Sequence, residues 1–203
     1  SKKKVKDTSK YWFNNHVFYY KFVMKSVFMK KTIFLIGYMG SGKSVIGKKL
    51  SNSILYSFYD LDNFITTNEG ITINEIFEQK KELYFRKIER EYLNELINKD
   101  EHKVISLGGG TPCYSDNMDL ILNTSNSDSI YLNRSIDFLV ERLYNKISSR
   151  PLIAHLKSKE ELKEFISKHI FERNQYYLRS KIILNTNNLE LDDVVEELKK
   201  LLG

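Results

Sequence analysis

Residues 37–44 combine the side chains and the spacing that hold phosphate groups in many proteins. They read GYMGSGKS and fit the pattern G-x-x-x-x-G-K-[ST]. Glycines let the backbone turn so that successive N–H groups point into one concavity, which binds phosphate oxygens. The ammonium of Lys43 can reach the outer phosphates of a nucleotide, and the hydroxyl of Ser44 can ligate Mg²⁺. This segment therefore predicts a nucleotide-binding site.

The segments on either side of this loop support that interpretation. The apolar, β-branched run at residues 32–36 predicts a buried parallel strand. Residues 44–55 carry apolar side chains at helical spacing, so a helix should begin near Gly42 with its positive dipole end facing the phosphates. A chance glycine-rich turn is the weaker alternative, because the motif is complete and has a strand before it.

Two carboxylates, Asp60 and Asp62, follow a second predicted strand at residues 56–59. In an open α/β sheet the carboxyl ends of the strands form the ligand crevice. Alternation in an extended segment would aim both carboxylates the same way. One acid could then serve a metal ion while the other contacts an acceptor hydroxyl. Taken alone, the pair is explained equally well as a strand-end turn with solvated acids.

Several other residues could grip an anion or shape a pocket. Arg86 and Glu89 stand three residues apart on a predicted helix, where their side chains can meet. The triple glycine at residues 108–110 follows a predicted strand and permits close approach of a ligand. Arg150 lies in a polar loop, and Arg173 lies on a late helix. Each also has a plain structural interpretation: a surface ion pair, a flexible turn, or a solvated loop or helix face.

From residue 32 onward, strand and helix patterns alternate, which predicts an α/β fold with helices on both faces of a parallel sheet. The predicted strands span residues 32–36, 56–59, 104–107, 129–132 and 182–184. The predicted helices span residues 44–55, 72–77, 82–97, 115–122, 135–146, 160–178 and 191–202. Ser115 is expected to cap the fourth of these helices. The polar stretch at residues 147–159 predicts a loop.

The net charge of +6 does not indicate a nucleic-acid-binding protein, because it arises at one end of the chain. Residues 1–29 hold seven of the 32 Lys and Arg and one of the 26 Asp and Glu, which leaves 25 of each sign elsewhere. The single cysteine, Cys113, excludes an intramolecular disulfide and suits a reducing cytoplasm. The four histidines are too scattered to form a zinc site.

Residues 1–28 differ in character from the rest of the chain. A lysine-rich start is followed by a cluster of aromatic residues, and the pattern changes at Met29. Polar residues interrupt the apolar run, so it predicts neither a secretory signal nor a membrane span. We expect a poorly ordered or non-native extension, with a weak basic-aromatic membrane contact as the alternative.

The motifs, in this order along the chain, resemble those of the shikimate kinase family, and the match covers residues 29–203. Five motifs carry the likeness: the loop at residues 37–44, D-x-D at 60–62, F-R-x-x-E at 85–89, the triple glycine at 108–110 and R-P-L at 150–152. Arg173 resembles a late arginine of the family, and Arg142 the arginine that packs on adenine. Five ordered motifs are far more specific than any one of them, so they favour the functional interpretation of each.

The resemblance implies a three-layer α/β/α domain with a five-stranded parallel sheet, a P-loop kinase of the nucleoside-monophosphate-kinase type. The domain would span residues 29–203, with a lid at about 147–159. The implied reaction is the Mg²⁺-dependent transfer of a phosphoryl group from ATP to the 3-hydroxyl of shikimate, in the synthesis of aromatic amino acids. The implied enzyme is a cytoplasmic monomer that binds neither nucleic acid nor a membrane.

The resemblance also assigns roles to individual residues. The implied ATP-binding residues are Gly40, Ser41, Gly42, Lys43, Ser44, Val45, Arg142 and Arg150. The implied shikimate-binding residues are Asp62, Phe85, Arg86, Gly108, Gly109, Gly110 and Arg173. Ser44 would ligate the Mg²⁺ ion, and Asp60 would act on it through water. Lys43, Asp62 and Arg150 would be the catalytic residues.

Two other functions fit parts of the sequence. One is another small-molecule or nucleotide kinase on the same fold. The arginine pair, the D-x-D motif and the triple glycine favour a small polyhydroxy acid over a nucleotide acceptor. The other is a non-catalytic nucleotide-binding module, which the intact Lys43, Ser44, Asp60 and Asp62 disfavour.

The glycine-rich loop generates the first prediction. The ammonium of Lys43 should meet the phosphates, so Lys43→Met should lower turnover by orders of magnitude while the fold survives. ADP release and circular dichroism on the same sample measure both quantities. Near-normal turnover by a folded Lys43→Met protein would contradict the motif assignment.

Overall fold

The computed structural model of the protein describes residues 32–147 and 152–203. Within these ranges, five strands form one parallel sheet in the order β2-β3-β1-β4-β5. The strands are β1 (Thr32–Ile36), β2 (Ser57–Asp60), β3 (Lys103–Ser106), β4 (Ser127–Asn133) and β5 (Ile182–Asn185). The helices are α2 (Lys43–Ile54), α3 (Leu61–Glu69), α4 (Ile73–Asn98), α5 (Asn117–Asn123), α6 (Ile136–Tyr144), α7 (Lys159–Tyr177) and α8 (Leu191–Leu202), and a 3-10 turn, η1, spans Thr111–Cys113.

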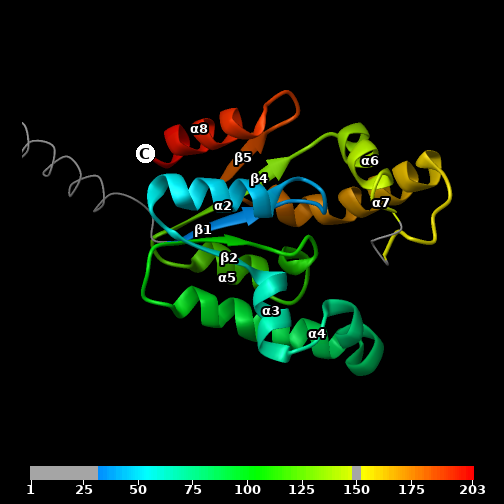
Figure 1. The fold of residues 1–203 in the computed structure, drawn as a ribbon. Coiled ribbons are helices and arrows are strands. Elements are labelled where there is room, and N and C mark those ends of the chain that lie inside the picture. The colour runs from blue at the N-terminus through cyan, green and yellow to red at the C-terminus, as the bar shows by residue number, and fades with distance from the viewer. Residues whose placement is uncertain (1–31, 148–151) are drawn as a thin grey trace, which may run out of the picture.

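The central strand β1 separates two hydrophobic cores. Its side chains alternate, so that Phe34 and Ile36 join the core on one face of the sheet, and Ile33 and Leu35 join the core on the other. Helices α2 and α8 cover one face, and α4 and α5 cover the opposite face (Figure 1). The predicted three-layer fold with five parallel strands is confirmed.

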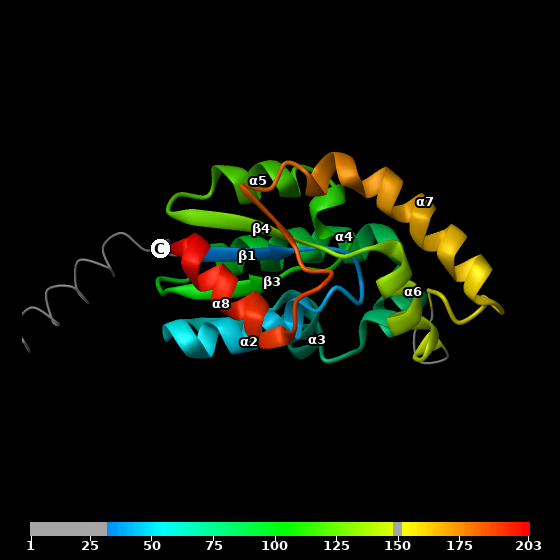
Figure 2. The same ribbon diagram turned by 90° about the horizontal axis from the view of Figure 1, so that it is seen from above.

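All five strands have their carboxyl ends at the same edge of the sheet, because the strands are parallel. The glycine-rich loop joins β1 to α2 at this edge. Helix α6 lies beyond the same edge in both views of the ribbon (Figures 1 and 2). In sheets of this type the ligand crevice forms at the carboxyl edge, where the chain switches from one side of the sheet to the other.

Helix α3 was not predicted, and it changes the geometry expected for Asp60 and Asp62. The extended conformation ends at Asp60, which caps α3 by accepting a hydrogen bond from the backbone N–H of Asn63 at 3.3 Å. Asp62 lies in the first turn of this helix. The prediction that strand alternation aims the two carboxylates was therefore wrong, and the start of a helix aims them instead.

Two details of the other helices also differ from the prediction. The predicted helices at residues 72–77 and 82–97 form one element, α4, which is broken at Lys81 with φ of 71°. Ser115 does not cap α5, because it adopts a left-handed conformation with φ of 51° and Asp116 takes the cap position. The carboxylate of Asp116 accepts hydrogen bonds from Arg90 rather than from the start of α5.

The N-terminal extension at residues 1–28 and the lid residue Arg150 lie outside the described residues, so their assignments stay predictions. Ile153, in the predicted lid, is fully buried and packs in a third core with Tyr38 and Leu143. No helix within residues 32–147 and 152–203 has the length and apolar character needed to cross a membrane.

Close packing of α2 on the sheet generates a stability prediction. A Cβ atom at Gly47 would lie 2.6 Å from Phe58 Cε2 and 3.0 Å from Leu35 Cδ1. Gly47→Val should therefore lose about 1–3 kcal/mol of unfolding free energy by overpacking, measured by urea denaturation. Lys48→Val, on the exposed side of the same helix, should change stability by less than about 0.5 kcal/mol. Equal losses in the two variants would show that helix propensity, rather than packing, sets the effect.

Candidate active site

The glycine-rich loop between β1 and α2 surrounds the side chain of Lys43. Gly40 and Gly42 have φ values of +82° and +100°, which residues with a Cβ atom rarely adopt. Lys43 Nζ donates hydrogen bonds to the carbonyl oxygens of Gly37 at 2.8 Å and Tyr38 at 3.0 Å. The side chain is only 8% exposed. The loop thus fixes an ammonium group at the N-terminal end of α2, where an anion is favoured.

A cavity of about 450 Å³ opens beside this loop at the carboxyl edge of the sheet. Residues from the glycine-rich loop, from the end of β2 and the start of α3, from the end of β3 and from the end of α6 line it. Its lining is Met39, Gly40, Gly42, Lys43, Ser44, Val45, Asp60, Asp62, Asn63, Ser106, Leu107, Gly108, Gly109, Arg142, Leu143 and Lys146. The cavity therefore joins the predicted phosphate-binding residues to the two carboxylates and to the triple glycine.

Oxygen atoms of the kind that bind hard cations lie close together on the β2 side of this cavity. Ser44 Oγ donates a hydrogen bond to Asp60 Oδ2 at 2.5 Å, and Ser106 Oγ lies 3.5 Å from Ser44 Oγ. No group of three or more His, Cys, Asp or Glu side chains that could hold a metal occurs in the described part of the chain. A hydroxyl and one carboxylate are a donor set that suits Mg²⁺, which takes most of its ligands from water and phosphate.

Asp62 lies in a crowded electrostatic environment within the cavity. A Cβ atom at Gly108 would lie 3.0 Å from Asp62 Oδ1, so this carboxylate closely approaches the triple glycine. Burial, reinforced by the carboxylates of Asp60 and Glu89, raises the pKa of Asp62 to about 6, and the cations Lys43 and Arg86 oppose the rise. A carboxylate with a pKa near 6 is ionised at pH 7 and can accept a proton from a hydroxyl.

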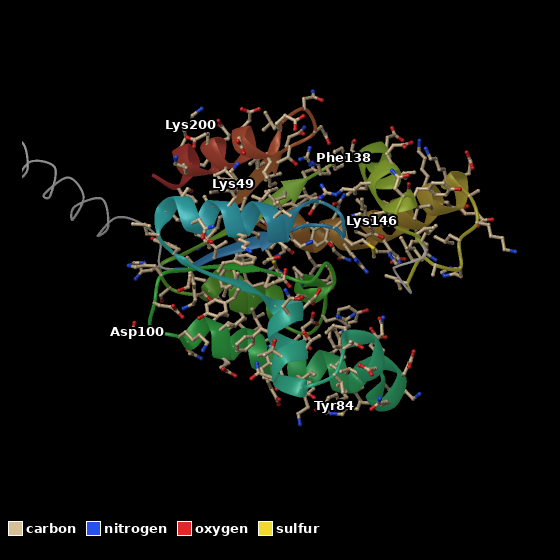
Figure 3. The ribbon with its side chains drawn as sticks, viewed as in Figure 1. Lys49, Tyr84, Asp100, Phe138, Lys146 and Lys200 are labelled. Atoms are coloured by element: carbon tan, nitrogen blue, oxygen red, sulfur yellow. The ribbon has the colours of Figure 1, made fainter. Side chains whose placement is uncertain are left out.

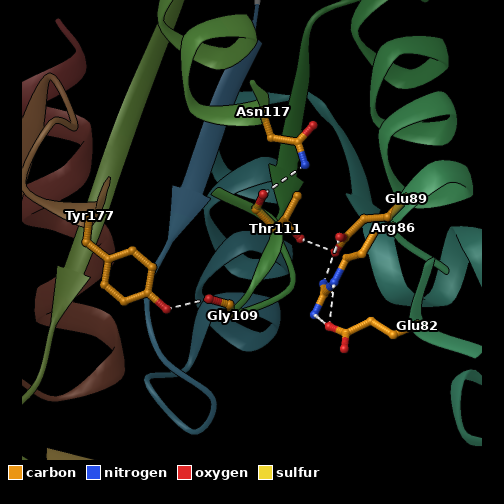
Figure 4. A network of polar contacts seen from close by, with 7 residues as sticks. All are labelled: Glu82, Arg86, Glu89, Gly109, Thr111, Asn117 and Tyr177. Carbon is orange, nitrogen blue, oxygen red and sulfur yellow. Dashed lines mark hydrogen bonds and ion pairs between the residues drawn. The ribbon is translucent and has the colours of Figure 1, made fainter. Parts of the chain in front are cut away.

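Glu89 anchors the other side of the triple glycine (Figure 4). Its side chain is 1% exposed, and it accepts hydrogen bonds from Thr111 Oγ1 at 2.6 Å and from Arg86 at 2.9 Å. The surface ion pair considered for Arg86 and Glu89 is therefore wrong, since the carboxylate is buried. Such a contact orients the guanidinium rather than merely pairing two solvated charges.

Arg86 retains donors for a ligand after its contacts within the protein are made. Its guanidinium has five N–H groups. One bonds to Glu89, and two bond to Glu82 at 3.2 and 3.3 Å (Figure 4). One face of the group stacks on the ring of Tyr114, whose centroid lies 3.5 Å away. A Cβ atom at Gly110 would lie 3.2 Å from Arg86, so a side chain there would crowd the two remaining N–H groups.

Arg173 reaches the same glycines from α7. A Cβ atom at Gly109 would lie 3.6 Å from Arg173, and the guanidinium carbon lies 5.4 Å from the centre of the Tyr38 ring. Tyr177, one turn further along α7, donates a hydrogen bond to the carbonyl oxygen of Gly109 (Figure 4). The two predicted anion-binding arginines, Arg86 and Arg173, therefore approach adjacent glycines of one turn.

A second cavity, of about 350 Å³, lies on the other side of the glycine-rich loop. It is bounded by the start of α2, by α6 and by the segment that follows β5. Its lining is Ser41, Gly42, Val45, Ile46, Arg134, Phe138, Arg142, Asn187, Asn188, Leu189, Glu190 and Leu191. Phe138, on α6, is labelled in Figure 3. Gly42, Val45 and Arg142 line both cavities, so the two cavities adjoin at these residues.

Comparison with known proteins agrees with this arrangement. The family model described as shikimate kinase matches residues 39–202. The chain belongs to the shikimate kinase family. It is 45% identical over 171 residues to the shikimate kinase of Flavobacterium johnsoniae, covering 84% of this chain and 98% of that protein. It is 44% identical over 172 residues to the shikimate kinase of Flavobacterium psychrophilum, covering 85% and 99%.

Solved structures of shikimate kinases share this fold. That of Bacteroides thetaiotaomicron has 34% sequence identity and a TM-score of 0.74, covering 84% of this chain and 97% of its own. That of Acinetobacter baumannii, solved in complex with shikimate, has 27% identity and a TM-score of 0.76, covering 87% and 95%. The P-loop kinase fold expected from the sequence is therefore confirmed.

Several residues of the site belong to no local sequence motif. Thr111 contacts Glu89 and Tyr114 contacts Arg86, and neither was predicted, although both lie within four residues of the triple glycine. Residues 187–191 were missed as well, although they follow β5 at the carboxyl edge, where a ligand contact is expected. Phe85 is 4% exposed and packs on Phe77, and its ring centre lies 5.1 Å from the guanidinium carbon of Arg86, so it also supports the position of Arg86.

The raised pKa of Asp62 generates a prediction about stability. The folded protein holds this proton more tightly than the unfolded chain does, so the stability from Asp62 is complete below about pH 4 and is lost as the pH rises through about 6. At pH 7.5, Asp62→Asn should therefore be more stable than the native protein by on the order of 1–3 kcal/mol. The difference should shrink toward pH 4 in urea denaturation.

Glu91→Gln, an exposed change in the interior of α4, serves as the control. It should alter stability by less than about 0.5 kcal/mol at either pH. A gain from Asp62→Asn that stayed constant between pH 4 and pH 7.5 would contradict the assignment of the effect to a buried carboxylate.

Proposed function

We propose that this chain transfers the γ-phosphoryl group of ATP to the 3-hydroxyl of shikimate, giving ADP and 3-phosphoshikimate. One observation carries the proposal: Asp62, Arg86 and Arg173 approach the three glycines of a single turn, beside a complete phosphate-binding loop. A carboxylate that can accept a proton, next to two arginines, suits a substrate that carries both a hydroxyl and a carboxylate. Membership of the shikimate kinase family supports the same substrate.

The nucleotide fits the two cavities that flank the glycine-rich loop. Its phosphates would bind the backbone N–H groups of Gly40, Ser41 and Gly42 and the ammonium of Lys43. The base would enter the second cavity, against Arg142 and residues 187–191. A planar guanidinium stacks well on an aromatic ring, which favours Arg142 as the residue that packs on adenine. Val45 is exposed and lines both cavities, so it would contact the nucleotide between its two ends.

Ser44 and Asp60 would hold the Mg²⁺ ion that accompanies ATP. The hydroxyl would ligate it directly and the carboxylate would act through water, which agrees with their mutual contact in this structure. When bound, Mg²⁺ neutralises part of the phosphate charge and fixes the orientation of the outer phosphates.

The acceptor would be oriented by charge and by shape. Arg86 has two N–H groups left for the carboxylate, and Arg173 approaches the neighbouring glycine of the turn. Gly108, Gly109 and Gly110 would let the sugar-like ring approach the backbone closely. Asp62 would orient the reacting hydroxyl and accept its proton, since its pKa of about 6 leaves it ionised at neutral pH.

The remaining predicted roles complete the proposal. Arg150, which lies outside the described residues, would reach the transferred phosphoryl group from the lid. Closure of the lid would exclude water, so that ATP is not simply hydrolysed. A monomeric state, a cytoplasmic location and the absence of nucleic-acid and membrane partners stay predictions.

The direct test is shikimate-dependent ADP formation by the purified protein in the presence of Mg²⁺. The proposal expects rapid ADP release with shikimate, and slow release without an acceptor or with a nucleoside monophosphate. ADP formation with a nucleoside monophosphate but not with shikimate would support another kinase of this fold. A failure of all acceptors to stimulate ADP release would support a non-catalytic nucleotide-binding module.

Variants of the acceptor site generate a further prediction. Arg86→Lys keeps the charge but loses the planar fork that satisfies two glutamates and a ligand at once. A charge-assisted hydrogen bond contributes about 1.5–3 kcal/mol, so KM for shikimate should rise about ten- to a hundredfold, at 1.4 kcal/mol per tenfold. KM for ATP should barely change. Asp62→Asn cannot accept a proton and should lower kcat by about 10²–10⁴-fold.

Arg90→Lys is the matched control for Arg86→Lys. Arg90 lies one turn further along α4, and its guanidinium makes two hydrogen bonds to Asp116 instead of to Glu82 and Glu89. This change should leave both Michaelis constants near those of the native protein. Calorimetry with an ATP analogue and with shikimate, run separately, checks the division. If Arg86→Lys weakened nucleotide binding and acceptor binding equally, the assignment of Arg86 to the acceptor site would be wrong.

A further inference from the structure

Tyr38 is the second residue of the glycine-rich loop, and its side chain points away from the phosphate site. The residue is 2% exposed, and it packs in the core that α6 and α7 share. Its carbonyl oxygen accepts a hydrogen bond from Lys43 Nζ at 3.0 Å. Tyr38 is thus hydrogen-bonded to Lys43 through its backbone, while its ring packs between α6 and α7.

The hydroxyl of Tyr38 meets a histidine on α7. A hydrogen bond of 3.2 Å joins Tyr38 Oη to His169 Nδ1. The imidazole ring is held from another side by Phe165, with 4.1 Å between the ring centres. Burial and the charge of Arg173 lower the pKa of His169, which favours the neutral form of the ring beside that arginine.

Arg173 lies one helical turn after His169, on the same face of α7. Its guanidinium carbon is 5.4 Å from the centre of the Tyr38 ring, within the range of a cation–π contact. The Tyr38 ring therefore touches the face of α7 that carries both side chains. The hydroxyl fixes the helix at His169, and the ring supports Arg173.

We propose that Tyr38 and His169 are positioning residues for Arg173, and that they link the acceptor site to the nucleotide site. Binding of phosphate would draw Lys43 Nζ toward the nucleotide and change the hydrogen bond that the Tyr38 carbonyl accepts. The ring and hydroxyl of Tyr38 transmit this change to α7. The acceptor carboxylate then meets a better placed Arg173 when the nucleotide is bound. The inference rests on the proposed function, because it takes the acceptor to be bound by Arg173.

The test is the dissociation constant of shikimate, measured by calorimetry with and without a saturating non-hydrolysable ATP analogue and Mg²⁺. In the native protein the analogue should tighten shikimate binding. Tyr38→Phe keeps the ring but loses the bond to His169, so shikimate should bind about three- to tenfold more weakly with the analogue present. At 1.4 kcal/mol per tenfold this is about 0.7–1.4 kcal/mol. The tightening by the analogue should also decrease, while the affinity for the analogue alone should change by less than about twofold, since Lys43 is intact.

Two substitutions at His169 separate positioning from simple destabilisation. His169→Leu should reproduce the effect of Tyr38→Phe, and the double variant should be no worse than either single one, because both remove the same hydrogen bond. His169→Asn keeps a polar atom near the position of Nδ1 and should restore most of the affinity for shikimate. Tyr92→Phe, which removes a hydrogen bond from Tyr92 to Glu69 elsewhere in the fold, should leave both ligands unaffected.

The outcomes distinguish this inference from the function on which it rests. If the native protein bound no shikimate, the proposed function would fail and the inference with it. If the native protein bound shikimate and Tyr38→Phe kept both the affinity and the tightening by the analogue, the inference alone would be overturned. Equal weakening of shikimate and of the analogue by Tyr38→Phe would show a general loosening of the fold, and that result would also overturn it.

Discussion

The acceptor side of this site depends on one buried carboxylate. Glu89 is 1% exposed, and burial of a charge is costly unless hydrogen bonds compensate for it. Its partners come from two parts of the chain, Arg86 on α4 and Thr111 in the turn after the triple glycine. Satisfying Glu89 therefore fixes α4 against this turn and orients the Arg86 guanidinium. The negative charge of Glu89 also contributes to the raised pKa of Asp62, so the same group that positions the arginine helps to tune the proton acceptor.

The glycines contribute to the site through the side chains that they lack. Each of the three turn glycines is approached by a different functional group: Asp62 at Gly108, Arg173 at Gly109 and Arg86 at Gly110. A Cβ atom at Gly108 would lie 2.8 Å from Thr111 Oγ1, so even alanine would disturb the hydroxyl that Glu89 binds. The turn therefore has to lack side chains, both to admit the ligand and to leave intact the hydrogen bonds of Glu89 that orient Arg86.

The sequence predicts those parts of the site that local patterns determine. The strand, the glycine-rich loop and the helix start around Lys43 were predicted correctly, because all three lie within one short segment. The structure places Asp60 and Asp62 in one cavity, but not by strand alternation, because the strand ends at Asp60, which caps α3, and Asp62 already belongs to that helix. Tyr114 and residues 187–191 were missed, because their importance comes from contacts between segments that are distant in sequence, and such contacts leave no local pattern.

The cations of the site are held in place by different means, and the difference matches their roles. Two of the contacts that orient Lys43 are hydrogen bonds to carbonyl oxygens, which carry only partial charges, so a phosphate can compete with them. Arg86 is oriented by two carboxylates, which hold it more firmly and still leave two N–H groups for a ligand. The difference suits an ammonium group that has to turn toward the phosphates and a guanidinium that has to hold the acceptor in one orientation. Tyr38 contacts two cations of the site, since its carbonyl oxygen accepts a hydrogen bond from Lys43 and its ring lies beside Arg173.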